Sequence, residues 1–243
     1  MTKRPFNAKR CRANELLELL HSDVFGFMST QAKGGYEYFI TFTDDYSRFV
    51  YVYLMKQKSK TFEKFKEFKA EVENQLGKHI KAIWSDRDGE YFLGYFKDYL
   101  TENGIISQLT APITPQQNGM AKRRNRTLLE MVRPMMSYST LPISFWGYAL
   151  GTTMHLLNLV PSKMFLKHLW NCGMGVSLVW DTSTFGVVQH ELKGKSNKLE
   201  PKSKLCLFVG YPKWTRGYLF YSRNDNKVFV STNAKIFGKW LYE

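Results

Sequence analysis

The sequence contains little cysteine and no long apolar run. Its three cysteines are far apart, at positions 11, 172 and 206, so they indicate neither a disulfide framework nor a zinc cluster. No stretch approaches the roughly 18 apolar residues of a membrane-spanning helix, and the N-terminus, Met-Thr-Lys-Arg-Pro, has no apolar signal core. We therefore expect no zinc site, no membrane partner, and an intracellular location in the nucleus or the cytoplasm.

The chain is also poor in acidic residues. It has 21 Asp and Glu against 35 Lys and Arg, which gives a formal net charge of +14. Such a surplus favours a polyanionic partner, because a basic surface that neutralises phosphates releases their condensed counterions. The 44% hydrophobic and 16% aromatic content of the 243 residues indicates a packed globule rather than a disordered chain. These quantities define a broad class of protein and leave its chemistry open.

The hydrophobic pattern of residues 19–109 predicts a mixed α/β domain. Two runs rich in Phe, Tyr, Val and Ile flank the polar turn 44–47, as is typical of a β-hairpin. In residues 59–76 the apolar positions follow helical spacing, and Gly77 is a natural helix stop. The full predicted order is strands near 19–29, 36–43 and 48–55, a helix at 59–76, a strand at 80–84, a helix at 91–103 and a strand at 105–109. This order predicts a mixed five-stranded sheet with helices packed on it.

The second half of the chain begins with a long basic helix. We expect this helix over residues 117–138, bent at Pro134. A further helix is expected over 144–159. Beyond it, a lysine-rich linker (194–204) precedes a tail, residues 205–237, in which short β-like runs alternate with turns. The tail is therefore predicted to be a small separate β module.

Three short segments carry closely spaced acidic, polar and basic residues. They are HSDVFG (21–26), WSDRDGEY (84–91) and PQQNGMAKRRNRTL (115–128). Together they closely resemble the integrase core of copia-type retrotransposons, and the tail is similar to the SH3-like module that follows that core. The resemblance implies a ribonuclease-H-like fold, a Pol polyprotein origin and DNA as the partner.

The resemblance also implies a metal site in which one position is altered. Family members hold catalytic Mg²⁺ or Mn²⁺ with Asp, Asp and Glu, with 35 residues between the second Asp and the Glu. Asp23 and Asp86 match the two Asp positions, each at or near a predicted strand end, where carboxylates can converge. Counting 35 residues past Asp86, from 87 to 121, leads to Lys122. The implied catalytic positions are thus Asp23, Asp86 and Lys122, and the implied metal ligands are the two Asp residues.

Lys122 opposes metal binding for an electrostatic reason. A protonated amine offers no lone pair, and a dication 4 Å away repels it by on the order of 8 kcal/mol at an effective dielectric constant of 20. The expected state of Lys122 is an ion pair with Asp23 or Asp86. Glu130 lies eight residues further along, roughly 12 Å in a helix, which is too far to replace the missing ligand. We therefore expect impaired Mg²⁺ binding and an inactive, integrase-like pseudoenzyme.

The basic helix is the expected contact with nucleic acid. In the family this helix lies beside the substrate DNA, and phosphate contacts of this kind carry no sequence preference. Helical spacing places Lys122, Arg126 and Arg133 on one side, and two neighbouring arginines widen that stripe. The full set of expected contacts is Gln116, Gln117, Asn118, Lys122, Arg123, Arg124, Arg126 and Arg133. The alternative interpretation is a charged face that contacts only solvent.

Residues 164–189 do not resemble the family, and a shifted reading frame would explain the difference. Taking the last base of each codon with the first two of the next, from Met164 to His190, permits the string VPKTPLELWNGRKPSLGHLHVWGCPA. This string is similar to the family sequence, and five positions that leave no synonymous choice all agree with it. We infer two compensating indels, so that the segment was never selected to pack. A diverged loop is the alternative.

The resemblance divides the chain into four parts. They are residues 1–16, which follow the position of a zinc module that this sequence lacks, a catalytic core over 17–160, a degenerate connector and basic linker over 161–204, and an SH3-like module over 205–237. The oligomerisation and end-binding roles of the zinc module are expected to be absent, while a homo-oligomer stays open. Two other functions also stay open: a domesticated, non-enzymatic nucleic-acid-binding or interaction protein, and a nuclease that uses Asp23 and Asp86 with metal.

Overall fold

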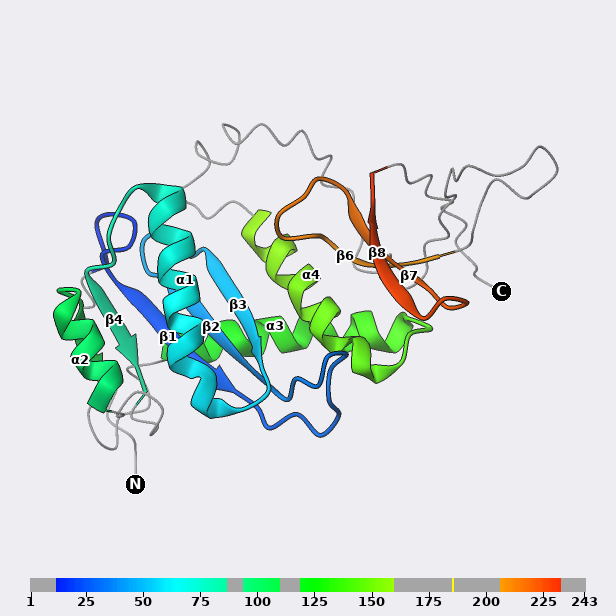
Figure 1. Cartoon of the computed structure of the whole chain (residues 1–243), viewed down its shortest axis with the longest axis horizontal. Coiled ribbons are helices and arrows are strands. Elements are labelled where there is room, and N and C mark those ends of the chain that lie inside the picture. Colours follow the sequence, from blue (N-terminus) through cyan, green and yellow to red (C-terminus); the bar gives the residue numbers. More distant parts are fainter. Residues whose placement is uncertain (1–11, 87–93, 110–118, 160–184, 186–205, 233–243) are drawn as a thin grey trace, which may run out of the picture.

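The protein forms a mixed five-stranded sheet and a separate three-stranded sheet, joined by helices (Figure 1). The computed structural model describes residues 12–86, 94–109, 119–159, 185 and 206–232. Its elements are β1 (Leu20–Phe25), β2 (Tyr38–Asp44), β3 (Val50–Met55), η1 (Lys58–Lys60), α1 (Thr61–Leu76), β4 (Ala82–Ser85), α2 (Gly94–Glu102), β5 (Ile106–Leu109), α3 (Gly119–Tyr138), η4 (Ile143–Phe145), α4 (Trp146–Leu159), β6 (Leu207–Gly210), β7 (Tyr218–Ser222) and β8 (Lys227–Ser231).

The large sheet has the strand order β3-β2-β1-β4-β5. The first three strands form an antiparallel meander, while β1 and β4, and then β4 and β5, pair in parallel. Parallel neighbours need a crossover connection, and α1 and α2 supply it. The predicted mixed five-stranded sheet with packed helices is therefore confirmed, and β1, which carries Asp23, is its central strand.

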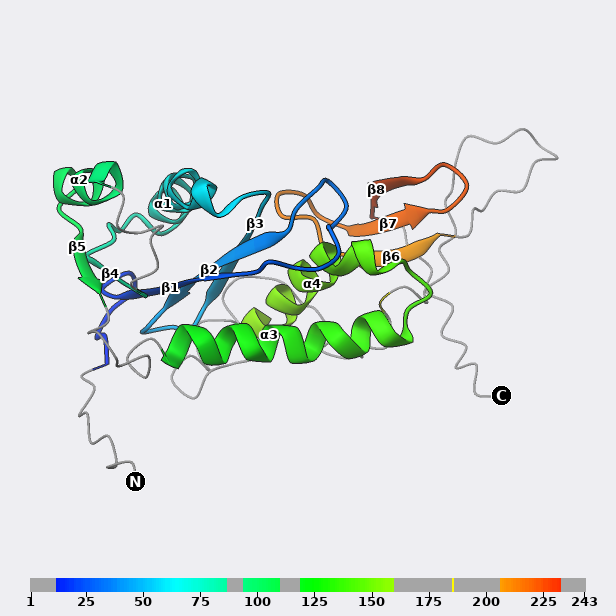
Figure 2. The ribbon, with the colours of Figure 1, turned by 90° about the horizontal axis from the view of Figure 1, so that it is seen from below.

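One face of the large sheet is covered by α1 and α2 (Figure 2). The apolar side of α1 buries Phe65, Phe68 and Val72, and the Phe68 ring stacks on Phe42 of β2 with 4.3 Å between ring centroids. The helix ends where predicted: Gly77 adopts a left-handed φ of 61° and its N–H donates to Glu73 O. This layer forms a large aromatic core on one face of the sheet, and its side chains do not reach the opposite face.

The opposite face of the sheet is covered by α3 and α4 (Figure 2). α3 buries Leu128, Val132 and Met135 on its sheet-facing side, and it continues through Pro134 to Tyr138. None of the described helices is long and apolar enough to cross a membrane. α3 is thus an amphipathic surface helix with its polar first turns over the carboxyl-terminal ends of β1 and β4.

The three-stranded sheet packs against α4 and shares its core. Val209 of β6 and Tyr221 of β7 are buried in the same cluster as Trp146 and Leu150. At Gly210 the approach is so close that a Cβ atom would lie 2.7 Å from Thr152 Oγ1, and its φ of 146° also favours glycine. The small sheet is therefore docked firmly on α4.

Several predicted boundaries differ from the observed ones. The strand expected over 19–29 is shorter, because β1 ends at Phe25, and the strand expected over 80–84 is Ala82–Ser85. Of the segment 164–189, the structure describes Phe185, which is 2% exposed and belongs to the same buried cluster as Trp146 and Tyr221. The rest of that segment, and the linker that follows it, lie outside the described residues.

Candidate metal and nucleic-acid site

The pairing of β1 with β4 places Asp23 and Asp86 side by side. The register pairs Leu20 with Ile83 and His21 with Trp84. A register continued by two residues would place Asp23 opposite Asp86, the first residue after β4. Neighbouring strands lie about 4.8 Å apart, and residues at equivalent positions of a parallel pair project from the same face. The two carboxylates therefore meet at one end of the sheet, on the face that α3 covers.

α3 provides a nitrogen donor to each carboxylate. Lys122 Nζ donates to Asp86 Oδ2 at 2.6 Å, and Asn125 Nδ2 donates to Asp23 Oδ2 at 2.8 Å. Residues three apart lie on the same side of a helix, so one side of α3 reaches both acids. Asn125 Oδ1 in turn accepts from Thr41 Oγ1 at 2.9 Å, which orients the amide with its nitrogen toward Asp23.

The two acids differ in their exposure. Asp23 is 7% exposed and Asn125 is 1% exposed, so their hydrogen bond lies in the protein interior. The side chains of Lys122 and Asp86 are 43% and 21% exposed, so their ion pair lies partly in solvent and contributes no more than about 1 kcal/mol to stability. The buried half of the site is thus held by a neutral amide and the exposed half by an ammonium group.

The described carboxylate site differs from a magnesium centre built of three carboxylates. Mg²⁺ binds oxygen ligands, yet an oxygen of each carboxylate here faces a nitrogen donor. Two carboxylates and one ammonium sum to a charge of −1, whereas three carboxylates would sum to −3. Within the described ranges, no group of three or more His, Cys, Asp or Glu side chains could hold a metal ion. Lys122 and Asn125 each donate to one of the two acids, so the two described contacts involve no metal ion.

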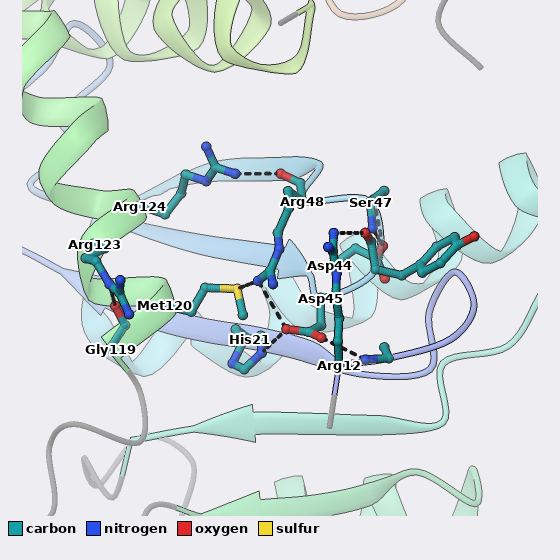
Figure 3. Close-up of polar contacts among 12 residues, drawn as sticks. Arg12, His21, Asp44, Asp45, Ser47, Arg48, Gly119, Met120, Arg123 and Arg124 are labelled. Carbon is teal, nitrogen blue, oxygen red and sulfur yellow. Dashed lines mark hydrogen bonds and ion pairs between the residues drawn. The ribbon is translucent and has the colours of Figure 1, made fainter. Parts of the chain in front are cut away.

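A second polar cluster lies at the β2–β3 turn, where the sequence predicted only a polar hairpin turn. Asp45 is buried and its Oδ1 contacts both His21 Nε2 and Arg48 Nη1 at 3.1 Å (Figure 3). Burial alone would raise the pKa of Asp45, but hydrogen bonds from His21 and from the Ala13 N–H, with the charge of Arg48, lower it to about 2. The consecutive acids in this turn were the available sequence signal. Their burial depends on contacts with distant residues.

Arg48 also forms one wall of a pocket against α3. The pocket has a volume of about 330 Å³, and its lining consists of Arg48, Met120, Arg123, Arg124 and Thr127. Arg124 Nη2 donates to the carbonyl oxygen of Arg48 at 3.0 Å, and Arg48 Nη1 contacts Met120 Sδ (Figure 3). Burial, and then the charge of Arg48, lower the pKa of Arg124. The turn and the helix thus bring together two arginines that are 76 residues apart.

The structure separates the predicted basic stripe into two flanks. At 3.6 residues per turn, Lys122 and Arg124 point roughly 160° apart around the axis of α3. One therefore reaches Asp86 while the other reaches Arg48. Arg126 and Arg133 are exposed. Gln116, Gln117 and Asn118, which were expected to contact nucleic acid, lie outside the described residues.

Comparison with known proteins identifies the chain's relatives. Over 236 residues it is 38% identical to the retrovirus-related Pol polyprotein from transposon TNT 1-94 of Nicotiana tabacum, which covers 94% of this chain and 18% of that protein. The chain is a homologue of transposon Pol polyproteins. A second such polyprotein, from transposon RE2 of Arabidopsis thaliana, is 29% identical over 237 residues, covering 96% of this chain and 16% of the relative. The Pol homologue thus spans less than a fifth of the length of either relative.

Three further matches concern the fold of this Pol homologue. Residues 187–239 match the family described as the retroviral polymerase SH3-like domain. A chain of the simian T-cell lymphotropic virus intasome, solved in complex with PP2A regulatory subunit B56 gamma, superposes with a TM-score of 0.54 at 16% identity, covering 97% of this chain and 84% of that chain. The HTLV-2 integrase catalytic core domain in complex with magnesium gives a TM-score of 0.49 at 18% identity, covering 66% and 98%. The ribonuclease-H-like sheet with a C-terminal SH3-like module is the fold that the sequence predicted.

Proposed function

We propose that this chain is an integrase-like DNA-binding protein in which Lys122, rather than a metal ion, neutralises the carboxylate site, and that it does not catalyse strand transfer. The observation that carries the proposal is the 2.6 Å ion pair between Lys122 Nζ and Asp86 Oδ2. Integrase-type phosphoryl transfer uses a pair of metal ions to activate the nucleophile and stabilise the leaving oxygen. A site of charge −1 with two nitrogen donors directed at its acids is poorly suited to hold them.

DNA binding is supported by charge and by likeness. The net charge of +14 favours a polyanion, and the expected contacts are to phosphates. The simian T-cell lymphotropic virus chain that shares this fold belongs to an intasome, and we propose a homo-oligomer for this chain by analogy. Binding of this kind weakens steeply as salt is raised, because each phosphate contact releases counterions.

The test uses the full chain and a labelled DNA duplex. We expect fluorescence anisotropy to show binding whose logarithmic affinity falls linearly with the logarithm of salt concentration. In the same mixtures, with Mg²⁺ or with Mn²⁺, a strand-transfer assay should yield no joined product. Joined product in either metal would establish an active integrase, and cleaved but unjoined DNA would establish a metal-dependent nuclease using Asp23 and Asp86; either would overturn the proposal. Absence of DNA binding at low salt would overturn its other half and favour a protein-interaction role.

A further inference from the structure

We propose that the pocket between α3 and the β2–β3 turn binds one phosphodiester group of a nucleic-acid backbone, with Arg48 and Arg124 as its contacting side chains. The inference rests on the proposed DNA-binding function and adds a defined subsite to it. This subsite is separate from the carboxylate site, because Arg124 and Lys122 project from opposite flanks of α3.

The net positive charge of the pocket favours the binding of an anion. Its described lining contains three arginines, one methionine and one threonine. Counting Asp45, which contacts Arg48 from outside the lining, the local charge is three minus one, or +2. Arg124 is half-buried beside Arg48, and the acceptor it contacts there is a neutral carbonyl oxygen rather than a carboxylate. The Arg48 guanidinium contacts Asp45 and Met120 instead, but its positive charge is close enough to lower the pKa of Arg124, and a bound anion would offset this repulsion.

Arg48 is positioned before any ligand arrives. Its φ of 67° lies in the left-handed region, which bulky residues rarely adopt and which often marks a functional position. The turn maintains this conformation through hydrogen bonds from the Arg48 N–H to Asp44 O and from the Ser47 N–H to Asp44 Oδ2. The guanidinium is then oriented by Asp45, which His21 contacts from β1. Asp45 is thus a positioning residue, and Arg48 is held ready for a ligand.

The size and chemistry of the pocket fit a phosphate with its first waters. A volume of about 330 Å³, open to solvent, leaves room for a phosphate group. Arginine binds phosphate oxygens through two parallel N–H donors, which a lysine cannot reproduce. A single phosphodiester carries no base identity, so the pocket would contribute affinity and orientation without sequence preference.

The experiment measures DNA affinity across a salt series for the wild-type chain and four variants. Arg124→Ala should weaken binding and lower the slope of log affinity against log salt by about 1, the value for one lost phosphate contact. Arg124→Lys should weaken binding while keeping most of the slope, because charge is retained without the planar fork. Asp45→Asn should weaken binding without lowering the slope, because it disturbs the orientation of Arg48 and removes no cation. Arg216→Ala is the matched control: it removes one exposed arginine from the β6–β7 connection and should leave the slope unchanged.

The outcomes separate this subsite from the proposed function. If the wild-type chain binds DNA and Arg124→Ala keeps the wild-type slope and affinity, the subsite is wrong and DNA binding stands. If the wild-type chain does not bind DNA, the proposed function is wrong. In that case, titration with inorganic phosphate shows which ligand the pocket binds. If the wild-type chain binds phosphate and Arg124→Ala does not, the pocket is a site for free phosphate, and the nucleic-acid assignment is wrong. Circular dichroism melting of each variant confirms that the comparison is between folded proteins.

Discussion

On our proposal, replacing Lys122 by glutamate should make the site depend on a bound metal ion. In the wild-type chain the ammonium lies 2.6 Å from Asp86 Oδ2, in a half-exposed pair that contributes no more than about 1 kcal/mol. Lys122→Glu loses that contribution and places a carboxylate near Asp86. Two like charges 4 Å apart repel by about 4 kcal/mol at an effective dielectric constant of 20, a ceiling because the new side chain can turn toward solvent.

We therefore expect Lys122→Glu, without divalent cations, to lower the free energy of unfolding by roughly 1–4 kcal/mol. At about 2–4 °C per kcal/mol for a chain of this size, the melting temperature should fall by several degrees. Mg²⁺ at a hundred times its dissociation constant would restore about 2.7 kcal/mol, because it binds the folded state alone. The wild-type melting temperature should not respond to Mg²⁺.

The assay is thermal melting in EDTA, in MgCl₂ and in NaCl of equal ionic strength, with calorimetric titration of Mg²⁺ into each folded protein. Lys122→Gln is the matched control, because it removes the ion pair without adding a ligand, and it should melt slightly lower than wild type in all three buffers. Equal Mg²⁺ affinity and equal Mg²⁺-dependent shifts in the wild-type and glutamate proteins would refute our interpretation of position 122.

Three further predictions concern the surroundings of the site. Asn125→Ala should lower the free energy of unfolding by roughly 2–4 kcal/mol in urea denaturation, because it leaves buried Asp23 Oδ2 and Thr41 Oγ1 without this partner; an effect below about 0.5 kcal/mol would mean that the amide is not structural. Phe185 belongs to the buried cluster that includes Trp146 and Leu150 of α4, so Phe185→Ala should cost about 3–5 kcal/mol; a neutral result would instead agree with the inference that residues 164–189 were never selected to pack. The pKa of Asp45 is lowered to about 2, so its roughly 2 kcal/mol contribution is present above pH 4 and is lost as the pH falls toward 2. Asp45→Asn should flatten acid unfolding across that window, and an unchanged acid profile would contradict the assignment.

The sequence predicted the elements whose patterns are local and strong. In α1 the apolar spacing and the stop at Gly77 determine the helix without reference to the rest of the chain. The prediction that Asp23 and Asp86 lie close together came from their places in two predicted neighbouring strands, and the observed register of β1 and β4 is compatible with it. Boundaries were less accurate: β1 is shorter than predicted, because the sheet pairing that ends at Phe25 depends on β2.

Other features of the site could not be predicted from the sequence. The basic stripe was interpreted as one surface, yet Lys122 and Arg124 contact different elements. Arg124 contacts Arg48, a residue that is distant in sequence and lies next to α3 only in the folded structure. Asn125 was missed altogether, although its spacing of three from Lys122 was a usable signal, because an asparagine in a helix has no acidic or basic character to attract attention.

On our proposal, the contacts of Lys122 and Asn125 stabilise this corner of the fold in place of a catalytic metal. Three carboxylates converging at one end of a sheet would repel one another unless a cation were bound, so an intact acidic triad would make this corner of the fold depend on metal. Here Asn125 holds the buried acid with an uncharged donor, and Lys122 neutralises the exposed one. On our proposal, Lys at position 122 in place of the family's Glu stabilises the folded chain and abolishes the reaction. Stability and activity often oppose each other in this way at active sites. This can be tested with Lys122→Glu alone. The variant should lower the stability of the metal-free fold whether or not it restores catalysis.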